Sequence, residues 1–437
     1  MTVATVVRQF GPAYAARFGA AMPAGHRRAL DDLAACRTAA MGGHVTQCDT
    51  CGVEHFVYHS CRNRSCPSCH GASTRAWLAA RETELLPVPY FHVVFTLPAD
   101  LRTIVRSHQR VLLGALMQTA ADSLQALAAD PHDLGGTVGI LAVLHTWTRT
   151  LGYHPHVHCL VPGGALAPDG ETWRRARGHY LVPVRALSVG FRARFLARWR
   201  RVLPEVAVPP AVWKKPWVVY AKPTVQAADL VLRYLARYVH RAAITDARIL
   251  RVDATTVTFR YQDATARAWR TMTLPGEEFL RRFLQHVLPR GFHKVRYYGF
   301  WRPRAAETRT QLQQQLAPVR RVAVASPEDA PLLLRVPPVP LCTQCGRGHV
   351  YRTRRHRAAA TPMIHVGLHR PMAPTRAPLV RMRRRVVRAW RFVRLTPRAQ
   401  APRDPLRRSQ STSTPPGKRR RASTRPMAAS SHALQTP

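Results

Sequence analysis

The residues best suited to metal chemistry form the segment HPHVH at 154–158. Side chains alternate along a strand, so His156 and His158 would project from the same face of a sheet. Two adjacent imidazoles can bind a divalent metal ion whose other coordination positions stay open for phosphate oxygens. Pro155 cannot donate a hydrogen bond to a neighbouring strand, which can leave the first histidine outside the site. The third protein ligand stays open among three residues: His154, His145 and His92.

A second reactive group lies in the segment LRYLARYVHR at 232–241. Tyr234 and Tyr238 are four residues apart, so they would be neighbours on one face of a helix. A tyrosine hydroxyl can attack a phosphodiester and hold the cut strand as a phosphotyrosine. Arg237 or Arg241 could neutralise the charge that develops in this step. Taken alone, the tyrosines are more simply explained by an amphipathic helix; beside a histidine metal site, they predict attack on a phosphodiester.

Cysteines indicate a structural metal site near the N-terminus. Two CxxC turns can supply the four thiolates of a tetrahedral zinc ion. We therefore predict one structural Zn²⁺ on four residues: Cys48, Cys51, Cys66 and Cys69. Cys61 is a surplus thiol, either a core residue or part of a second site, and Arg62 and Arg64 beside it suit phosphate contacts on a rigid loop. Cys342 and Cys345 form a further, isolated CxxC.

The composition predicts a nucleic-acid partner. The 437 residues include 67 Lys+Arg and 23 Asp+Glu, a net charge of +44. This excess argues against an ordinary metabolic enzyme and for a polyanionic partner, most simply nucleic acid. No apolar run approaches the roughly 20 residues that span a bilayer, and the N-terminus lacks a secretory h-region. We expect a cytoplasmic, nucleoid-associated protein whose cysteines stay reduced.

Several elements must position these side chains, and their patterns predict the fold class. The predicted strands are Tyr90–Leu97, Thr137–Thr148, His156–Val161, His179–Val184 and Trp217–Ala221, with a ribbon over Ile249–Arg260. The predicted helices are Ala72–Leu86, Leu101–Ala129, Phe191–Val202, Val225–Ala243 and Gly276–Leu288. Neighbouring strands lack the helical crossovers that parallel pairing requires, so we predict an α+β fold with an antiparallel sheet.

The sequence resembles the zinc-binding, two-tyrosine HUH transposases of rolling-circle insertion sequences. The resemblance runs from about Cys36 to Gly299 and rests on motifs in the family's order: GGHVTQCDTCG, SCRNRSCPSC, PVPYFHVVFTLP, GYHPHVHCLVPGG, RYLARYVHR and EEFLRRFLQHVLPRGFHKVRYYG. It implies an enzyme that nicks and rejoins single-stranded DNA at element ends and targets through a 5′-phosphotyrosine. His156 and His158 would match the metal histidines, on a central antiparallel sheet, and Tyr234 and Tyr238 the nucleophiles.

The resemblance also implies Mg²⁺ or Mn²⁺ as the catalytic metal, and imidazole ligands alone favour Mn²⁺. Two alternatives stay open: a plasmid relaxase or replication initiator of the same chemistry, and a non-catalytic zinc-dependent nucleic-acid-binding protein. We expect no membrane partner, and the oligomeric state stays open.

The expected domains follow from these motifs. They are a zinc-binding, DNA-binding domain at 1–87, an HUH catalytic domain at 88–300, a linker with the isolated CxxC at 301–350 and a disordered Arg/Pro-rich tail at 351–437. The tail is either a nonspecific nucleic-acid arm or a non-adaptive extension.

Overall fold

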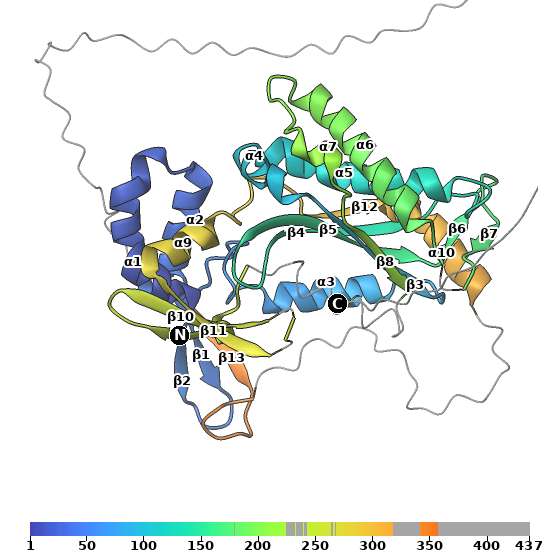
Figure 1. Cartoon of the computed structure of the whole chain (residues 1–437). Helices are drawn as coiled ribbons and strands as arrows, with labels where there is room; N and C mark the ends of the chain where they lie inside the picture. The colour runs from blue at the N-terminus through green and yellow to red at the C-terminus, as the bar shows by residue number, and fades with distance from the viewer. Residues whose placement is uncertain are drawn as a thin grey trace, which may run out of the picture. The chain divides into compact units, whose positions relative to one another are not determined.

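A five-stranded antiparallel sheet carries the histidine segment on its middle strand (Figure 1). The structure is a computed structural model that describes residues 1–178, 180–223, 232, 239, 243–263, 265–266, 268–317 and 341–356. These residues belong to the first of two units, 1–368 and 369–437, into which the chain divides. The predicted nucleophiles and arginines at 234, 237, 238 and 241, and the tail from residue 357 onward, lie outside the described residues.

The described elements follow one another along the chain as helices and strands. The helices are α1 (Val3–Phe18), α2 (Ala24–Ala35), α3 (Gly71–Glu82), α4 (Arg102–Ser107), α5 (Gln109–Ala128), α6 (Val184–Val202), α7 (Ala211–Lys214), α9 (Gly276–Leu284) and α10 (Ala306–Leu316). The strands are β1 (Gly43–Cys48), β2 (Glu54–Tyr58), β3 (Tyr90–Thr96), β4 (Ile140–Trp147), β5 (Tyr153–Pro162), β6 (Gly164–Leu166), β7 (Trp173–Arg175), β8 (Val219–Pro223), β9 (Ile249–Val252), β10 (Thr256–Gln262), β11 (Trp269–Pro275), β12 (Val295–Tyr298) and β13 (Val350–His356).

The central sheet has the strand order β12-β4-β5-β3-β8, and every neighbouring pair is antiparallel. This confirms the predicted α+β fold with an antiparallel sheet. Because β5 has a partner on both sides, the segment at 154–158 is held in the interior of the sheet rather than at an edge. Its register is therefore fixed from two directions.

The two faces of this sheet have different covers. Figure 1 draws α5 and α6 over one face and α3 beneath the other. The face beneath α5 and α6 buries Phe95 and Val157 in one core with Phe191 and Trp199 of α6. On the opposite face, which carries His156 and His158, the next alternate residue of β5 is Leu160, which lies in a smaller core with Tyr90, Leu141, Leu232 and Trp301. Alternation along β5 thus separates a large apolar core from the histidines.

One expectation about membranes needs correction. Helix α5 is long and apolar enough to cross a bilayer by length and composition alone, although the sequence pattern predicted no such stretch. More than half of the relevant window is buried, and Leu112, Leu116 and Leu124 are fully enclosed in the core with the sheet. The apolar character of α5 is therefore explained by packing on the sheet.

The N-terminal helices share a core with residues more than 200 positions later in the sequence. Val3 and Phe10 of α1 and Leu33 of α2 pack with Phe259 of β10 and Phe279 of α9. Figure 1 draws α1, α2 and α9 side by side. The backbone N–H of Val3 also donates to Asp246 at 2.8 Å. Residues 1–35 thus pack against the chain that follows the histidine strand.

Two further differences from the predicted elements concern residues 180–184 and 350–356. The predicted strand over His179–Val184 is absent from residues 180–183, because Pro183 caps the N-terminus of α6; His179 is not described. Residues 350–356, which span the predicted linker–tail boundary, form β13 and pair antiparallel with β1. The first residues assigned to the tail are therefore ordered by a strand that lies some 300 positions earlier in the sequence.

Candidate metal centres and the histidine face

Three imidazoles converge on the sheet face opposite α5 and α6. His156 and His158 alternate on β5, and His145 of β4 is the direct cross-strand partner of His156. One ring nitrogen from each residue lies within 4.8 Å of the others. The ring centroid of His145 is 4.2 Å from that of His158 and 5.2 Å from that of His156. Of the three candidates for a third donor, the structure brings His145 into the group.

The other two candidates have different partners. His92 of β3 lies beside the group, and its Nε2 is 2.8 Å from Nδ1 of His158 with the two rings nearly parallel. Nδ1 of His154 is 2.6 Å from a guanidinium nitrogen of Arg102. The β4–β5 ladder shifts register between His145 and Trp147, where Pro155 cannot donate. Of the three candidates that the sequence left open, His154 is thus held by Arg102 and is not part of the donor group.

Burial prepares the three donors for a metal ion. Desolvation lowers the pKa of His156 to about 4, and it lowers the pKa values of His145 and His158 well below their ordinary range. All three rings are therefore neutral near pH 7, the form in which imidazole binds a metal. Nδ1 of His156 donates to the backbone carbonyl of His154 at 2.7 Å, which leaves Nε2 as the nitrogen with a free lone pair.

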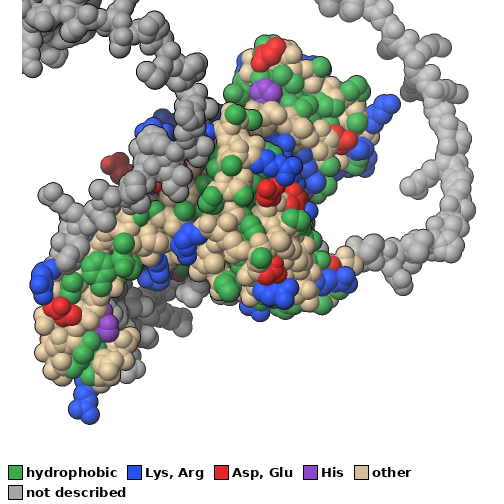
Figure 2. Space-filling view, turned by 90° about the vertical axis from the view of Figure 1, so that its left-hand side faces the viewer, with side chains coloured by type: hydrophobic (Ala, Val, Ile, Leu, Met, Phe, Trp, Pro, Cys, Tyr) green, Lys and Arg blue, Asp and Glu red, His purple; other side chains and the backbone are tan. Residues whose placement is uncertain are grey.

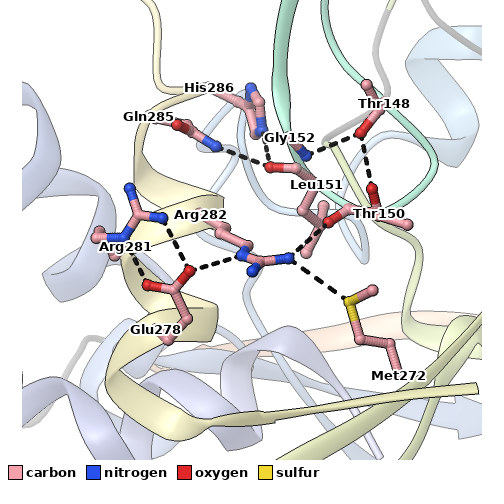
Figure 3. A network of polar contacts seen from close by, with 10 residues as sticks. All are labelled: Thr148, Thr150, Leu151, Gly152, Met272, Glu278, Arg281, Arg282, Gln285 and His286. Carbon is pink, nitrogen blue, oxygen red and sulfur yellow. Dashed lines mark hydrogen bonds and ion pairs between the residues drawn. The ribbon is translucent and has the colours of Figure 1, made fainter.

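The turn that leads into β5 is held by the end of α9 (Figure 3). Leu151 is fully buried and has a positive φ of 65°, a conformation that is costly for a branched side chain. Its carbonyl accepts hydrogen bonds from Gln285 Nε2 at 2.7 Å and His286 Nε2 at 3.2 Å. Arg282, which is paired with Glu278, donates to the carbonyl of Thr150 at 3.4 Å. These side chains compensate the unusual backbone and so fix where the histidine strand begins.

The predicted tyrosine helix is represented by two of its apolar residues. Tyr234, Tyr238, Arg237 and Arg241 lie outside the described residues, and so does most of the predicted helix Val225–Ala243. Leu232, two positions before the first tyrosine, is described and is fully buried in the small core on the histidine face.

The cysteines form two groups of four rather than the single group that the two CxxC turns predicted. One group is Cys36, Cys61, Cys66 and Cys69. Its Sγ–Sγ distances of 3.4–3.7 Å lie close to the edge of about 3.8 Å that a ZnS₄ tetrahedron with 2.3 Å bonds requires. They are far longer than a disulfide bond of about 2.05 Å. The donor set and spacing therefore fit a tetrahedral zinc ion.

The predicted ligand set is therefore wrong in its pairing. Cys48 and Cys51 do not approach Cys66 and Cys69; they lie with Cys342 and Cys345 in the second group. β1 ends at Cys48 and pairs with β13. The CxxC turn at 342–345, which precedes β13, therefore lies beside Cys48 and Cys51.

The two unexpected members of the first group come from single cysteines. Cys36 caps the C-terminus of α2, and Cys61 lies in the loop before α3. A hydrogen bond from the Cys66 thiol is the main reason that the pKa of Cys61 falls to about 5. The sequence signal for this group was the excess of two cysteines over the two CxxC motifs.

The arginines of the cysteine loop have separate roles. Arg64 donates to the backbone carbonyls of Phe292 at 2.8 Å, Pro289 at 2.5 Å and Leu288, so its guanidinium is occupied inside the protein. The predicted phosphate contact is therefore wrong for Arg64. Arg62 stays exposed.

Basic side chains are spread widely over the surface. Figure 2 shows Lys and Arg scattered over one face of the molecule rather than gathered into one patch. A hollow beside β2 combines such charges with aromatic rings: it is lined by Arg37, Arg62, Arg352, Phe56 and Tyr58, among others. The two rings are 46% and 44% exposed. Exposed rings among cations are typical of surfaces that stack and hold single-stranded nucleic acid.

Comparisons with known proteins agree with this combination of cysteines and histidines. A family model described as "Transposase zinc-binding domain" matches residues 6–97, and one described as "Putative transposase" matches residues 139–309. "Putative transposase y4qJ" of Sinorhizobium fredii is 40% identical over 323 residues, 68% of this chain and 79% of that protein.

The "Transposase for insertion sequence element IS801" of Pseudomonas savastanoi pv. phaseolicola is 30% identical over 287 residues, 61% of this chain and 68% of that protein. No solved structure matches the chain. The chain therefore belongs to the transposase family of the insertion sequences IS91 and IS801, and its N-terminal region is the zinc-binding domain of that family.

Proposed function

We propose that this transposase nicks one DNA strand at the end of its element, keeps the 5′ phosphate on Tyr234 or Tyr238, and joins that strand to a target. The observation that carries the proposal is the group of three neutral imidazoles on the sheet face opposite α5 and α6. Leu232, buried on the same face, supports a tyrosine segment that faces this group. The reaction would occur on DNA in the cytoplasm.

The cleavage step is a transesterification. A tyrosine hydroxyl gives up its proton and attacks the scissile phosphorus, so that a bond forms between the phenolic oxygen and phosphorus. The bond from phosphorus to the 3′ oxygen breaks, and that oxygen takes up a proton. Attack of a 3′ hydroxyl on the phosphotyrosine reverses these changes and rejoins the strand. No oxidant, reductant or nucleotide cofactor is consumed, and Arg237 or Arg241 would balance the phosphate charge.

His145, His156 and His158 would hold the divalent metal. The ion would polarise the scissile phosphate. The carbonyl of His154 keeps His156 in one tautomer, and the 2.8 Å contact from His92 Nε2 to Nδ1 of His158 leaves Nε2 of His158 for the metal. Because all three donors are imidazole nitrogens, the set favours Mn²⁺ over Mg²⁺, which prefers oxygen ligands.

Two surfaces are suited to the DNA strand. On the edge strand β8, the exposed Tyr220 and Lys222 share the histidine face: Tyr220 lies 6.5 Å from His92, ring centroid to ring centroid. The Lys222 ammonium is 5.4 Å from the ring of Tyr220. We propose that they guide a single strand toward the metal, by stacking on a base and by pairing with a phosphate. The hollow beside β2 is the corresponding candidate on the zinc-binding domain.

The zinc of that domain would be held by the first cysteine group. Four thiolates leave no open coordination position, so this ion would support folding rather than take part in phosphate chemistry. Cys36 and Cys66 belong to the core that α1 forms with α9, so the ion would lie next to this core.

The test is covalent capture of labelled single-stranded element ends by the purified full chain with Mn²⁺. We expect a protein–DNA adduct that the Tyr234→Phe/Tyr238→Phe double variant cannot form. His145→Ala should also lose the adduct and keep DNA binding, because the ligand is removed and the basic surface is not. His108→Ala is the matched control, since His108 contacts the carbonyl of Ile104 outside the donor group.

Mass spectrometry of the adduct identifies the modified tyrosine. An adduct in the double-tyrosine variant would refute the assignment of Tyr234 and Tyr238 as nucleophiles. Full activity of His145→Ala would refute the assignment of His145 as a metal ligand.

A further inference from the structure

Two turns of the same sequence type and the same geometry meet in the structure, although Cys51 and Cys342 are 291 positions apart. Each turn is CxxCG, with its glycine at a positive φ: 68° at Gly52 and 67° at Gly346. The glycine N–H donates to the carbonyl of the first cysteine in both, at 3.1 Å in one and 2.8 Å in the other. Turns of this kind direct both of their thiols to one side, as a metal ion requires.

The four thiols come together at metal-ligand distances. Cys48 Sγ lies 3.8 Å from Cys345 Sγ, and Cys51 Sγ lies 3.7 Å from Cys342 Sγ. All four sulfurs lie within 4.8 Å of one another. Both distances match the edge of about 3.8 Å in a ZnS₄ tetrahedron and exclude disulfide bonds, whose sulfurs are about 2.05 Å apart.

Backbone contacts hold the two turns together and also serve the sulfurs. Cys48 pairs with Val350 in the β1–β13 ladder, and the N–H of Asp49 donates to the carbonyl of His349 at 3.1 Å. The N–H groups of Thr50 and Gly348 point at the sulfurs of Cys48 and Cys345, both at 3.4 Å. Such donors stabilise thiolates in metal sites.

The close approach depends on Gly348. A Cβ at this position would lie 2.3 Å from Cys48 Sγ and 2.7 Å from a carboxylate oxygen of Asp49. The Asp49 carboxylate can rotate, but Cys48 Sγ cannot move away without leaving the group of four thiols. The two turns can therefore approach this closely only because residue 348 is a glycine.

We propose that a second zinc ion is bound by four residues: Cys48, Cys51, Cys342 and Cys345. This ion would hold residues 341–356 against the hairpin of β1 and β2. The site goes beyond the proposed nicking reaction and does not depend on it. Half of its ligands lie outside the zinc-binding match at residues 6–97. The chain would then carry two structural zinc ions, one in each cysteine group.

The first test is metal analysis of the purified full chain and of a Cys342→Ser/Cys345→Ser variant. We expect two zinc ions per wild-type chain and one in the variant, with the ion of the first cysteine group retained. One zinc in the wild type, iron in place of zinc, or an unchanged content in the variant would each overturn the proposal.

A second test uses Gly348→Ala, which leaves every cysteine in place, and Arg347→Ala as its exposed neighbour. Replacement of zinc by cobalt gives each tetrathiolate site a visible absorption, so sites can be counted without any activity assay. We expect Gly348→Ala to lose about half of this absorption and to exchange the amide hydrogens of β1 and β13 faster. Arg347→Ala should match the wild type. Full absorption in Gly348→Ala would contradict the close approach on which the site rests.

Discussion

Glu278 organises the end of α9 that holds the turn before the histidine strand, so its replacement tests this connection. Its carboxylate accepts hydrogen bonds from Arg281 at 2.5 and 2.8 Å and from Arg282 at 2.7 Å. Arg282 in turn donates to the carbonyl of Thr150. Glu278→Gln keeps the size of the side chain and removes its charge. We expect the variant to loosen both α9 and the turn.

The magnitude follows from the carboxyl group itself. Hydrogen bonds from Arg281, followed by those from Arg282, lower the pKa of Glu278 from its ordinary 4.5 to about 2. At about 1.36 kcal/mol per pH unit, this corresponds to roughly 3 kcal/mol of folding free energy. The Glu278 side chain is 29% exposed and that of Arg281 49%, so solvent screening reduces the expected loss to about 1–2 kcal/mol.

The sign of the pH dependence is fixed by the lowered pKa. The carboxylate stabilises the folded state above pH 4.5, where it is charged in both states, and this contribution disappears as the pH falls toward about 2. The difference between wild type and Glu278→Gln should therefore stay constant from about pH 7 to about pH 5. Below that it should shrink.

Hydrogen exchange of the amides in α9 and residues 148–152 measures this locally. A loss of about 1–2 kcal/mol should speed exchange roughly 5- to 30-fold. Glu277→Gln is the matched control, because Glu277 forms a single, more exposed pair with Arg17. Equal exchange in both variants, or a change confined to α9, would refute the role we give to Glu278.

Three further outcomes test the site and its support. His145→Ala should weaken Mn²⁺ binding by at least ~10-fold in calorimetric titrations, since it removes one of three donors; unchanged binding would point to another third ligand. Gly299→Ala should cost at least ~2 kcal/mol of stability in thermal melts, because φ is +59° and the added Cβ would lie 1.8 Å from the carbonyl oxygen of Val138. Tyr220→Ala should weaken binding of single-stranded DNA by about 1–3 kcal/mol. Tyr180→Ala is the control and should leave this binding unchanged, because the similarly exposed Tyr180 is hydrogen-bonded to Asp133.

The histidine pair could be predicted from sequence because it depends only on the alternation of side chains along one strand. The third donor could not, because it depends on the register between two strands. His145 faces His156 only because β4 and β5 pair as they do. A shift of one residue would move His145 to the opposite face, among the apolar side chains beneath α5.

The cysteine groups illustrate the same limit. Spacing within a CxxC turn predicts that two thiols share an ion, and both groups in the structure contain such turns. Which turns share an ion depends on tertiary pairing, and Cys48 meets Cys342 and Cys345 only because β13 joins β1. The sequence around Cys342 and Cys345 therefore could not show which other thiols they would meet.

Helices α1 and α2 were not among the predicted elements, and α1 contains Gly11 and Pro12, residues that usually interrupt helices. Tertiary packing outweighs this preference. Val3, Val6, Val7, Phe10 and Tyr14 of α1 are all buried, at the spacing of one helix face. That face packs against α2, which follows directly, and against α9 and the β9–β11 sheet, which lie far along the chain.

The zinc-binding region and the histidine face are connected through one continuous core. Cys36 and Cys66 of the first cysteine group pack in the same core as Phe279 and Phe283 of α9. The residues just after this helix, Gln285 and His286, hold the carbonyl of Leu151, and β5 begins two residues later. Leu151 itself is buried in that core with a positive φ. An ion that orders the first cysteine group would therefore also stabilise the helix on which the entry to the histidine strand depends, although this cysteine group and the three donor histidines form separate clusters.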